Sequence, residues 1–269
     1  MRLSEKINFV LGLFGLRLQR TEQIEEFWRD FTKFRQSKFT LDFLKSLPPQ
    51  KMQPVFSLLP NSKAQFHQDL MVLAELDFVS QGYFVEFGAH DGVHLSNTYL
   101  LESQFSWTGI LAEPSRTTFK QLQGNRSAKT FNLAVYSDSG LQLEFTETTR
   151  SELSTLSCYQ GEDFHASERE RTTVRKYLVP TISLLDLLEL NNAPKIIDYL
   201  SIDTEGGELE ILEQFDFQKY FIKIISVEHN FGAAREKIES LLLNNSYVRR
   251  YKQLDMVEDW YFLESVLKY

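Results

Sequence analysis

The chain has 269 residues, of which 42% are hydrophobic and 13% aromatic, and its formal net charge is −8. This much apolar material excludes an intrinsically disordered chain, and the acidic balance disfavours nucleic acid as a partner because it repels phosphate backbones. The length fits one large domain, or one domain with a terminal extension.

Residues 1–61 are predicted to be a helical extension followed by a proline-rich linker. Apolar side chains recur at helical spacing along one face, namely Ile24, Phe27, Trp28, Phe31 and Phe34. This face is expected to contact the core or a second copy of the chain, which makes a homodimer possible. Four prolines between residues 47 and 60 exclude a continuous helix there, so the main domain is expected over 62–269.

The first 20 residues leave two interpretations open. Ile7–Leu16 is mostly apolar but too short to span a bilayer. A helix that packs on protein is the favoured interpretation, and an interfacial membrane helix within residues 1–20 is the alternative.

From residue 62 onward, short apolar runs alternate with helical patterns. Strands are expected at Tyr83–Phe87, Thr108–Ala112, Lys129–Val135, Ile196–Ile202 and Ile222–Val227. Helices are expected at Leu95–Gln104, Thr117–Gln123, Leu184–Leu190, Glu208–Phe215 and Ala233–Leu243. Such alternation predicts an α/β fold, with a mostly parallel sheet covered by helices on both faces.

Two segments depart from the alternation. Residues 141–180 contain two strand-like runs, around Leu141–Phe145 and Arg171–Leu178, separated by a polar stretch. We interpret this segment as an inserted lid over the acceptor pocket, in which Ser151, Ser154 and Thr155 offer hydroxyl groups. At the end of the chain, Tyr247–Leu254 and Trp260–Leu263 have no helix between them, so they are expected to pair as an antiparallel hairpin at the sheet edge.

A glycine-containing loop, Glu86–Gly92, follows the first strand and precedes a helix. Gly88 permits a tight turn and a close approach of a bound ligand. The middle glycine of the dinucleotide motif is replaced by His90, which argues against an NAD-dependent oxidoreductase because two phosphates need bare backbone. S-adenosylmethionine has no phosphate, and Glu86 and Asp91 can balance the charge of its ammonium group.

Side chains that can titrate follow three further strands. Glu113 ends the second strand, where an acidic side chain can accept hydrogen bonds from ribose hydroxyls. Asp203 and Glu205 follow the fourth strand, and His229 follows the fifth. With the fourth strand beside the first and the fifth beside the fourth, these three side chains are predicted to converge at one edge. His229 is the favoured general base, Asp203 or Glu205 is the alternative base, and a divalent metal on Asp203 and Glu205 is the second mechanism.

Several sequence blocks, taken in order, resemble the FkbM family of methyltransferases. They are Gln65–Asp69, Phe84–Gly92, Leu95–Tyr99, Gly109–Pro114, Val179–Leu188 and Leu200–Glu208. The resemblance covers about 62–264 and implies a Rossmann-like fold with a mostly parallel seven-stranded sheet. It implies an S-adenosylmethionine-dependent enzyme that methylates a hydroxyl, often of a sugar, a glycan or a natural product. The cofactor contacts that it implies are Glu86, Gly88, Ala89, His90, Asp91, Gly92, Asn97, Thr98, Glu113, Pro114 and Asp203.

Two further expectations concern the location of the protein and an alternative function. The single cysteine, Cys158, allows no disulfide within the chain, so a cytoplasmic location is expected. A non-catalytic relative that uses residues 1–60 as an interaction arm is the alternative function, and retention of the carboxylates favours the enzyme.

Overall fold

The computed structural model describes residues 21–159, 172–254 and 256–265, with the backbone alone at 21–28. The chain divides into two compact units, 1–45 and 46–269. The predicted N-terminal helix is confirmed as α2 (Thr21–Ser46). The expected membrane-contact segment, 1–20, lies outside the described residues. Within the described part of the chain, none of the helices combines the length and the apolar composition that a membrane crossing requires.

The predicted linker is mostly helical, which corrects the expectation from its prolines. Helix α3 runs from Pro49 to Leu58 and continues as a 3₁₀ turn, η1 (Leu59–Asn61). Pro49 occupies the first helical position, where a missing N–H costs nothing. The Nζ of Lys51 donates to the carbonyl of Ala74 and lies 2.8 Å from Asp77 Oδ1, so tertiary contacts hold α3 against α4 (Gln68–Glu75).

The main sheet has seven strands in the order β10-β11-β9-β8-β1-β2-β3. Their bounds are β1 Tyr83–Phe87, β2 Thr108–Ala112, β3 Lys129–Phe131, β8 Ile196–Ile202, β9 Phe221–Glu228, β10 Tyr247–Arg250 and β11 Glu258–Leu263. β8 pairs in parallel with both β1 and β9, as predicted. β11 pairs antiparallel with both of its neighbours, which confirms the C-terminal hairpin.

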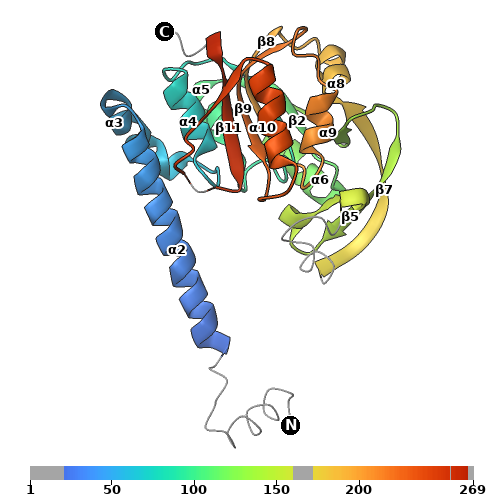
Figure 1. The fold of residues 1–269 in the computed structure, drawn as a ribbon. Helices are drawn as coiled ribbons and strands as arrows, with labels where there is room; N and C mark the ends of the chain where they lie inside the picture. The colour runs from blue at the N-terminus through green and yellow to red at the C-terminus, as the bar shows by residue number, and fades with distance from the viewer. Residues whose placement is uncertain (1–20, 160–171, 255, 266–269) are drawn as a thin grey trace, which may run out of the picture. The chain divides into compact units, whose positions relative to one another are not determined.

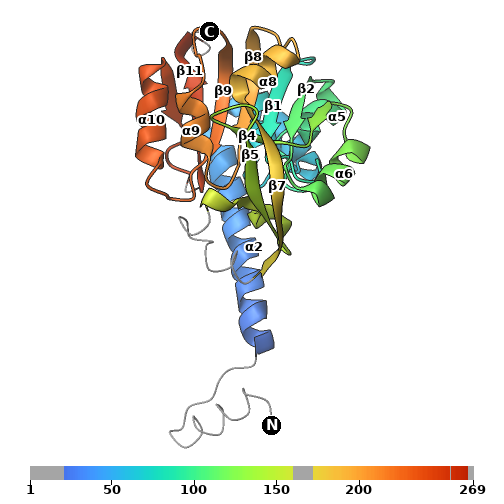
Figure 2. The same ribbon diagram turned by 90° about the vertical axis from the view of Figure 1, so that its right-hand side faces the viewer.

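Helices cover both faces of the sheet (Figures 1 and 2). One face carries α8 (Leu184–Leu190), α9 (Glu208–Glu213) and α10 (Arg235–Asn244), whose buried side chains form the main apolar cluster with alternate residues of the central strands. The other face carries α4, α5 (Tyr99–Phe105) and α6 (Arg116–Asn125). The protein therefore has the predicted doubly wound, Rossmann-like α/β architecture.

The inserted segment forms a second, four-stranded sheet in the order β4-β7-β5-β6. Its strands are β4 (Ala134–Tyr136), β5 (Gln142–Thr148), β6 (Thr155–Leu156) and β7 (Thr173–Ser183), with 3₁₀ turns η2 (Ser151–Leu153) and η3 (Ser157–Tyr159). β5 and β7 pair antiparallel, as expected. The predicted strand Lys129–Val135 is divided between the two sheets, because the Asn132 side chain donates to the carbonyls of Glu113 and Pro114 where the chain leaves β3.

Candidate functional site

A pocket lies at the carboxyl edge of the main sheet, where β1, β2 and β8 end, and the second sheet forms one of its walls. It encloses about 960 Å³, including its open mouth. The strands of the second sheet contribute apolar side chains to this wall, among them Val135, Phe145 and Leu156. The combination of an apolar wall with a few polar groups is typical of a small-molecule site.

The first part of the loop Glu86–Gly92 lines the pocket. The glycines of the loop allow it to turn close to neighbouring parts of the chain. Gly88 has φ +71°, and a Cβ there would lie 1.9 Å from the backbone oxygen of Asp203. A side chain at this position would therefore drive the ends of β1 and β8 apart. His90 also has positive φ, at 51°, and its N–H donates to Glu113 Oε2 at 2.8 Å. The loop is thus fixed to the end of β2.

Glu86 lines the pocket, but its carboxylate is already engaged by neighbouring donors. It accepts from the N–H of Asn97 at 2.8 Å and from the hydroxyls of Ser96 and Thr98, and Arg126 lies 3.8 Å away. These bonds hold residues 96–98 out of the helix, which explains why α5 begins at Tyr99 and not at Leu95. Glu86 therefore shapes the pocket wall more than it offers a free charge to a ligand.

Asn97 presents the pocket with a buried acceptor that the described residues leave without a donor. The residue is 5% exposed, and its Nδ2 donates to Ser201 Oγ at 2.9 Å, while its Oδ1 has no hydrogen-bond partner in the described part of the chain. A buried polar atom without a partner costs free energy, on the order of 1–3 kcal/mol. Because Asn97 lines the pocket, a ligand donor can satisfy this oxygen.

The other residues expected at the cofactor fall into two groups. Gly88, Ala89, His90, Glu113, Pro114 and Asp203 line the pocket with Glu86 and Asn97. Asp91, Gly92 and Thr98 stand behind this lining. Asp91 Oδ1 accepts from the N–H groups of Val93 and His94, Gly92 packs against Leu122 and Arg126, and Thr98 accepts from Arg126.

Glu113 stands at the end of β2, as predicted, with one backbone donor on each oxygen. Ser115 N–H donates to Oε1 at 2.7 Å and His90 N–H to Oε2 at 2.8 Å. Burial raises the pKa of this carboxyl to about 7, against the opposing effect of these hydrogen bonds. The side chain of Thr118 is a third donor to this carboxylate, which has capacity for one further donor.

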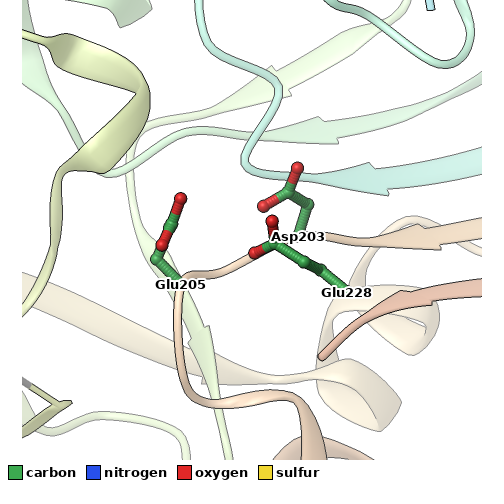
Figure 3. A group of neighbouring side chains, drawn as sticks. All are labelled: Asp203, Glu205 and Glu228. Atoms are coloured by element: carbon green, nitrogen blue, oxygen red, sulfur yellow. The ribbon is translucent and has the colours of Figure 1, made fainter. Parts of the chain in front are cut away.

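Three carboxylates gather beside the pocket, where β8 and β9 end (Figure 3). Oxygens of Asp203, Glu205 and Glu228 all lie within 4.8 Å of one another. Among the described residues this is the group whose spacing suits a cation. Asp203 follows Ile202, which pairs with Val227, so the parallel register sets Asp203 beside Glu228.

Burial and neighbouring negative charges raise the pKa values of Asp203 and Glu228 in this cluster. Burial raises the pKa of Asp203 to about 6, although a hydrogen bond from Glu228 opposes the rise. The pKa of Glu228 is raised well above its ordinary value by burial and by the neighbouring charges of Asp203 and Glu205. We therefore assign an ionised Asp203 that accepts a hydrogen bond from a protonated Glu228 at neutral pH.

His229 does not join this cluster, which corrects the predicted convergence of Asp203, Glu205 and His229. Its Nδ1 accepts from the N–H of Phe231 at 3.0 Å, and its Nε2 lies 3.5 Å from Asp259 Oδ1 on β11. Successive side chains of a strand point to opposite faces, so if Glu228 faces Asp203, His229 faces away. Alternation of side chains along a strand is the signal in the sequence that indicates Glu228, and not His229, as the residue beside Asp203.

The loop after β8 is held by Glu208, whose Oε1 accepts from Thr204 N–H, Thr204 Oγ1 and Gly206 N–H. These bonds fix the loop in a conformation with positive φ at Glu205, 58°, which a non-glycine residue seldom adopts. The carboxylate of Glu205 is thus positioned by its neighbours.

The inserted segment contacts the cofactor loop and contributes to the pocket lining. Ser151 Oγ lies 2.7 Å from His90 Nε2, and both Ser151 and Ser154 line the pocket. Thr155 is fully buried and donates to the carbonyl of Glu205, so it is not a ligand contact. Residues 160–171 of the predicted lid lie outside the described residues.

Solved structures with a similar fold are all distant in sequence. A methyltransferase from Pyrococcus furiosus is 10% identical with a TM-score of 0.35, over 72% of this chain and 80% of that one. TrmK of M. capricolum, solved with S-adenosyl-homocysteine, is 12% identical with a TM-score of 0.37, over 71% and 66%. The N-terminal domain of human METTL16, also with this product, is 13% identical with a TM-score of 0.38, over 72% and 68%. Likenesses this distant say nothing about the acceptor.

The family comparison is more specific than these structural likenesses. Among curated proteins, none matches the chain. The model of the methyltransferase FkbM domain matches residues 86–260, which is more than half of the chain and runs from the cofactor loop to the final strand. The chain therefore belongs to the FkbM methyltransferase family, and its methyl donor is S-adenosylmethionine.

Proposed function

We propose that this protein transfers a methyl group from S-adenosylmethionine to a hydroxyl of a sugar, a glycan or a natural product. The observation that carries the proposal is the group of Asp203, Glu205 and Glu228, whose carboxylates lie beside the cofactor loop at one edge of the sheet. Ligands of doubly wound sheets bind at this edge.

The pocket residues fit the methyl donor. Asn97 Oδ1 is a buried acceptor that suits the ammonium of the methionine end. Glu113 has capacity for one further donor, which suits a ribose hydroxyl, and the apolar wall with Phe145 and Leu156 suits an adenine ring. When bound, the donor supplies a methyl group on a positively charged sulfur. The sulfur is the leaving group when the acceptor oxygen attacks this methyl group in line.

The carboxylates favour an oxygen acceptor over a nitrogen acceptor. A neutral amine attacks with its own lone pair, whereas a hydroxyl is a poor nucleophile until its proton is removed. Asp203 is the residue we assign as the base, because it is the ionised member of the pair with Glu228. The hydroxyl proton passes to Asp203 as the new carbon–oxygen bond forms, and a base of this kind contributes roughly 10²–10⁴-fold to turnover.

A divalent cation on the same carboxylates is the alternative way to activate the hydroxyl. The two mechanisms differ in their response to chelation. A cation mechanism predicts that activity falls with EDTA and returns with Mg²⁺ or Mn²⁺, whereas a base mechanism predicts no change.

The proposal is tested by incubating the protein with methyl-labelled S-adenosylmethionine and a panel of glycans, free sugars and small alcohols. We expect label on an oxygen of at least one acceptor. Label on nitrogen acceptors alone would contradict O-methylation. Binding of S-adenosyl-homocysteine without transfer to any acceptor would favour the non-catalytic alternative.

A further inference from the structure

Helix α2 carries a row of exposed apolar side chains, which we call the α2 seam. Phe31, Phe34 and Leu41 are 42%, 65% and 51% exposed. Their spacings of 3 and 7 residues place them on one side of the helix, as in the contact row of paired helices. In the sequence the same spacing extends back to Phe27 and Ile24. Large apolar side chains gathered on one exposed face indicate a surface that a partner covers.

The charges of α2 are segregated along its length. Residues 21–32 have a net charge of −3, and residues 33–46 have a net charge of +3. Charges in the terminal turns of a helix also balance its dipole, but this effect falls off within one turn. It does not account for the charges near the middle of the helix, namely Asp30, Lys33 and Arg35.

This segregation decides how two copies of α2 can pair. Two identical helices form a closed pair either in parallel, with a two-fold axis along them, or antiparallel, with a two-fold axis across them. Parallel pairing sets the two acidic parts side by side and the two basic parts side by side, and like charges repel. Antiparallel pairing sets the acidic part of each helix against the basic part of the other.

The α2 seam and the charges agree on one antiparallel register. Full overlap of two seams over residues 24–41 pairs Phe31 of one copy with Phe34 of the other. The same overlap places Asp30 of one copy beside Arg35 of the other. Apolar contact and charge pairing are therefore satisfied by a single arrangement, which is the condition for a specific helix pair.

We propose that α2 pairs antiparallel with the α2 of a second copy of this chain, through the α2 seam. A membrane surface is the other partner that an aromatic helix face fits. Helices that bind such surfaces carry Lys and Arg along their polar face and are attracted to anionic lipid. The net charge of −3 over residues 21–32 opposes that attraction and favours a second copy. The inference does not depend on the proposed function, since it concerns association and not catalysis.

Sedimentation equilibrium of the full chain tests the association. The wild type is expected to be a dimer, and Phe34→Glu should raise the dissociation constant about 100-fold, because a carboxylate would then be buried in an apolar contact. The matched control is Phe56→Glu on α3, because Phe56 is 61% exposed and lies outside α2. The control should associate as the wild type does. Equal binding of S-adenosyl-homocysteine by both variants and the wild type shows that they fold.

Disulfide cross-linking in a Cys158→Ser background tests the orientation. A mixture of the Phe31→Cys and Phe34→Cys proteins should form a cross-linked heterodimer. The Leu41→Cys protein alone should not cross-link, because an antiparallel pair places its two new thiols about 26 Å apart along the helix axis.

Three results would overturn the pairing. They are a wild type that sediments as a monomer, equal association of Phe34→Glu and the wild type, and loss of association in Phe56→Glu to the same extent as in Phe34→Glu. Cross-linking of Leu41→Cys with itself would show parallel helices and overturn the antiparallel orientation. Binding of a monomeric wild type to phosphatidylglycerol vesicles would assign the α2 seam to a membrane surface instead.

Discussion

Two pairs of carboxylates stand at the same edge of one sheet and have different surroundings. On the side of β1 and β2, Glu86 and Glu113 accept hydrogen bonds from backbone N–H groups at 2.7–2.8 Å. On the side of β8 and β9, Asp203 and Glu228 face one another, with Glu205 nearby. The first pair is satisfied mainly by the protein, whereas the second pair is crowded by like charge.

The difference separates binding from chemistry. A carboxylate fixed by backbone donors has a defined position, which suits recognition of a cofactor. Asp203 lines the pocket and accepts a hydrogen bond from the neighbouring carboxyl of Glu228, an arrangement that suits a base. Substitutions on the first side are therefore expected to change affinity or folding, and those on the second side to change turnover.

The largest effect is expected where the two sides meet, at Gly88. Replacement by Ala places Cβ against the carbonyl of Asp203 at positive φ. Strain and overpacking together should destabilise the fold by roughly 2–6 kcal/mol. The matched control is Gly124→Ala in α6, where a Cβ meets nothing within 4 Å and should be neutral or stabilising by up to about 1 kcal/mol. Urea unfolding measures both, and equal stability of the two variants would contradict the close approach of β1 and β8.

Asp203→Asn is expected to give the second-largest effect, a loss of turnover of roughly 10²–10⁴-fold with little change in affinity for S-adenosyl-homocysteine. The amide keeps the size of the side chain but cannot take up the proton. Glu213→Gln, at the exposed end of α9, is the control and should be silent. A drop in cofactor affinity that matches the drop in turnover would assign Asp203 to the binding side.

Glu113→Ala should weaken binding of S-adenosyl-homocysteine by about 1–3 kcal/mol, the range for loss of a charged hydrogen-bond partner. Turnover at saturating cofactor should change less than in Asp203→Asn. Calorimetry measures the affinity, and Glu113→Gln should restore part of it because the amide oxygen still accepts. Unchanged affinity in the Ala variant would remove Glu113 from the cofactor site.

The smallest effect is a shift in pH dependence. Because the pKa of Asp203 is raised to about 6, turnover should rise with pH through about 6 and level off above it. Glu228→Gln keeps a hydrogen-bond donor beside Asp203 and should leave the midpoint nearly unchanged. Glu228→Leu removes the donor that lowers the pKa of Asp203, so its midpoint should move to higher pH. A midpoint that moves equally in both variants would show that the donor is unimportant.

The sequence by itself determined the parts of the fold in which local signals agree. β1, β2, β8 and α8 have the predicted bounds, because each is a short apolar run that ends at a glycine, a carboxylate or a capping residue. No helical pattern separates the last two apolar runs of the chain. This absence predicted that β10 and β11 pair as an antiparallel hairpin. The ordered blocks around Gly88, Glu113 and Asp203 predicted the family and the edge of the sheet at which its site lies.

Only the tertiary structure decided which side chains meet. The proline-rich segment is helical because Lys51 anchors it to α4, a contact between segments that no local pattern reveals. The pairing of Ile202 with Val227 places Glu228 beside Asp203, and His229 lies near Asp259 on β11, the strand that pairs antiparallel with β9. A shift of one residue along a strand exchanges the two faces of a sheet. Strand composition does not fix that register, and here the register decides which residue can act as the base.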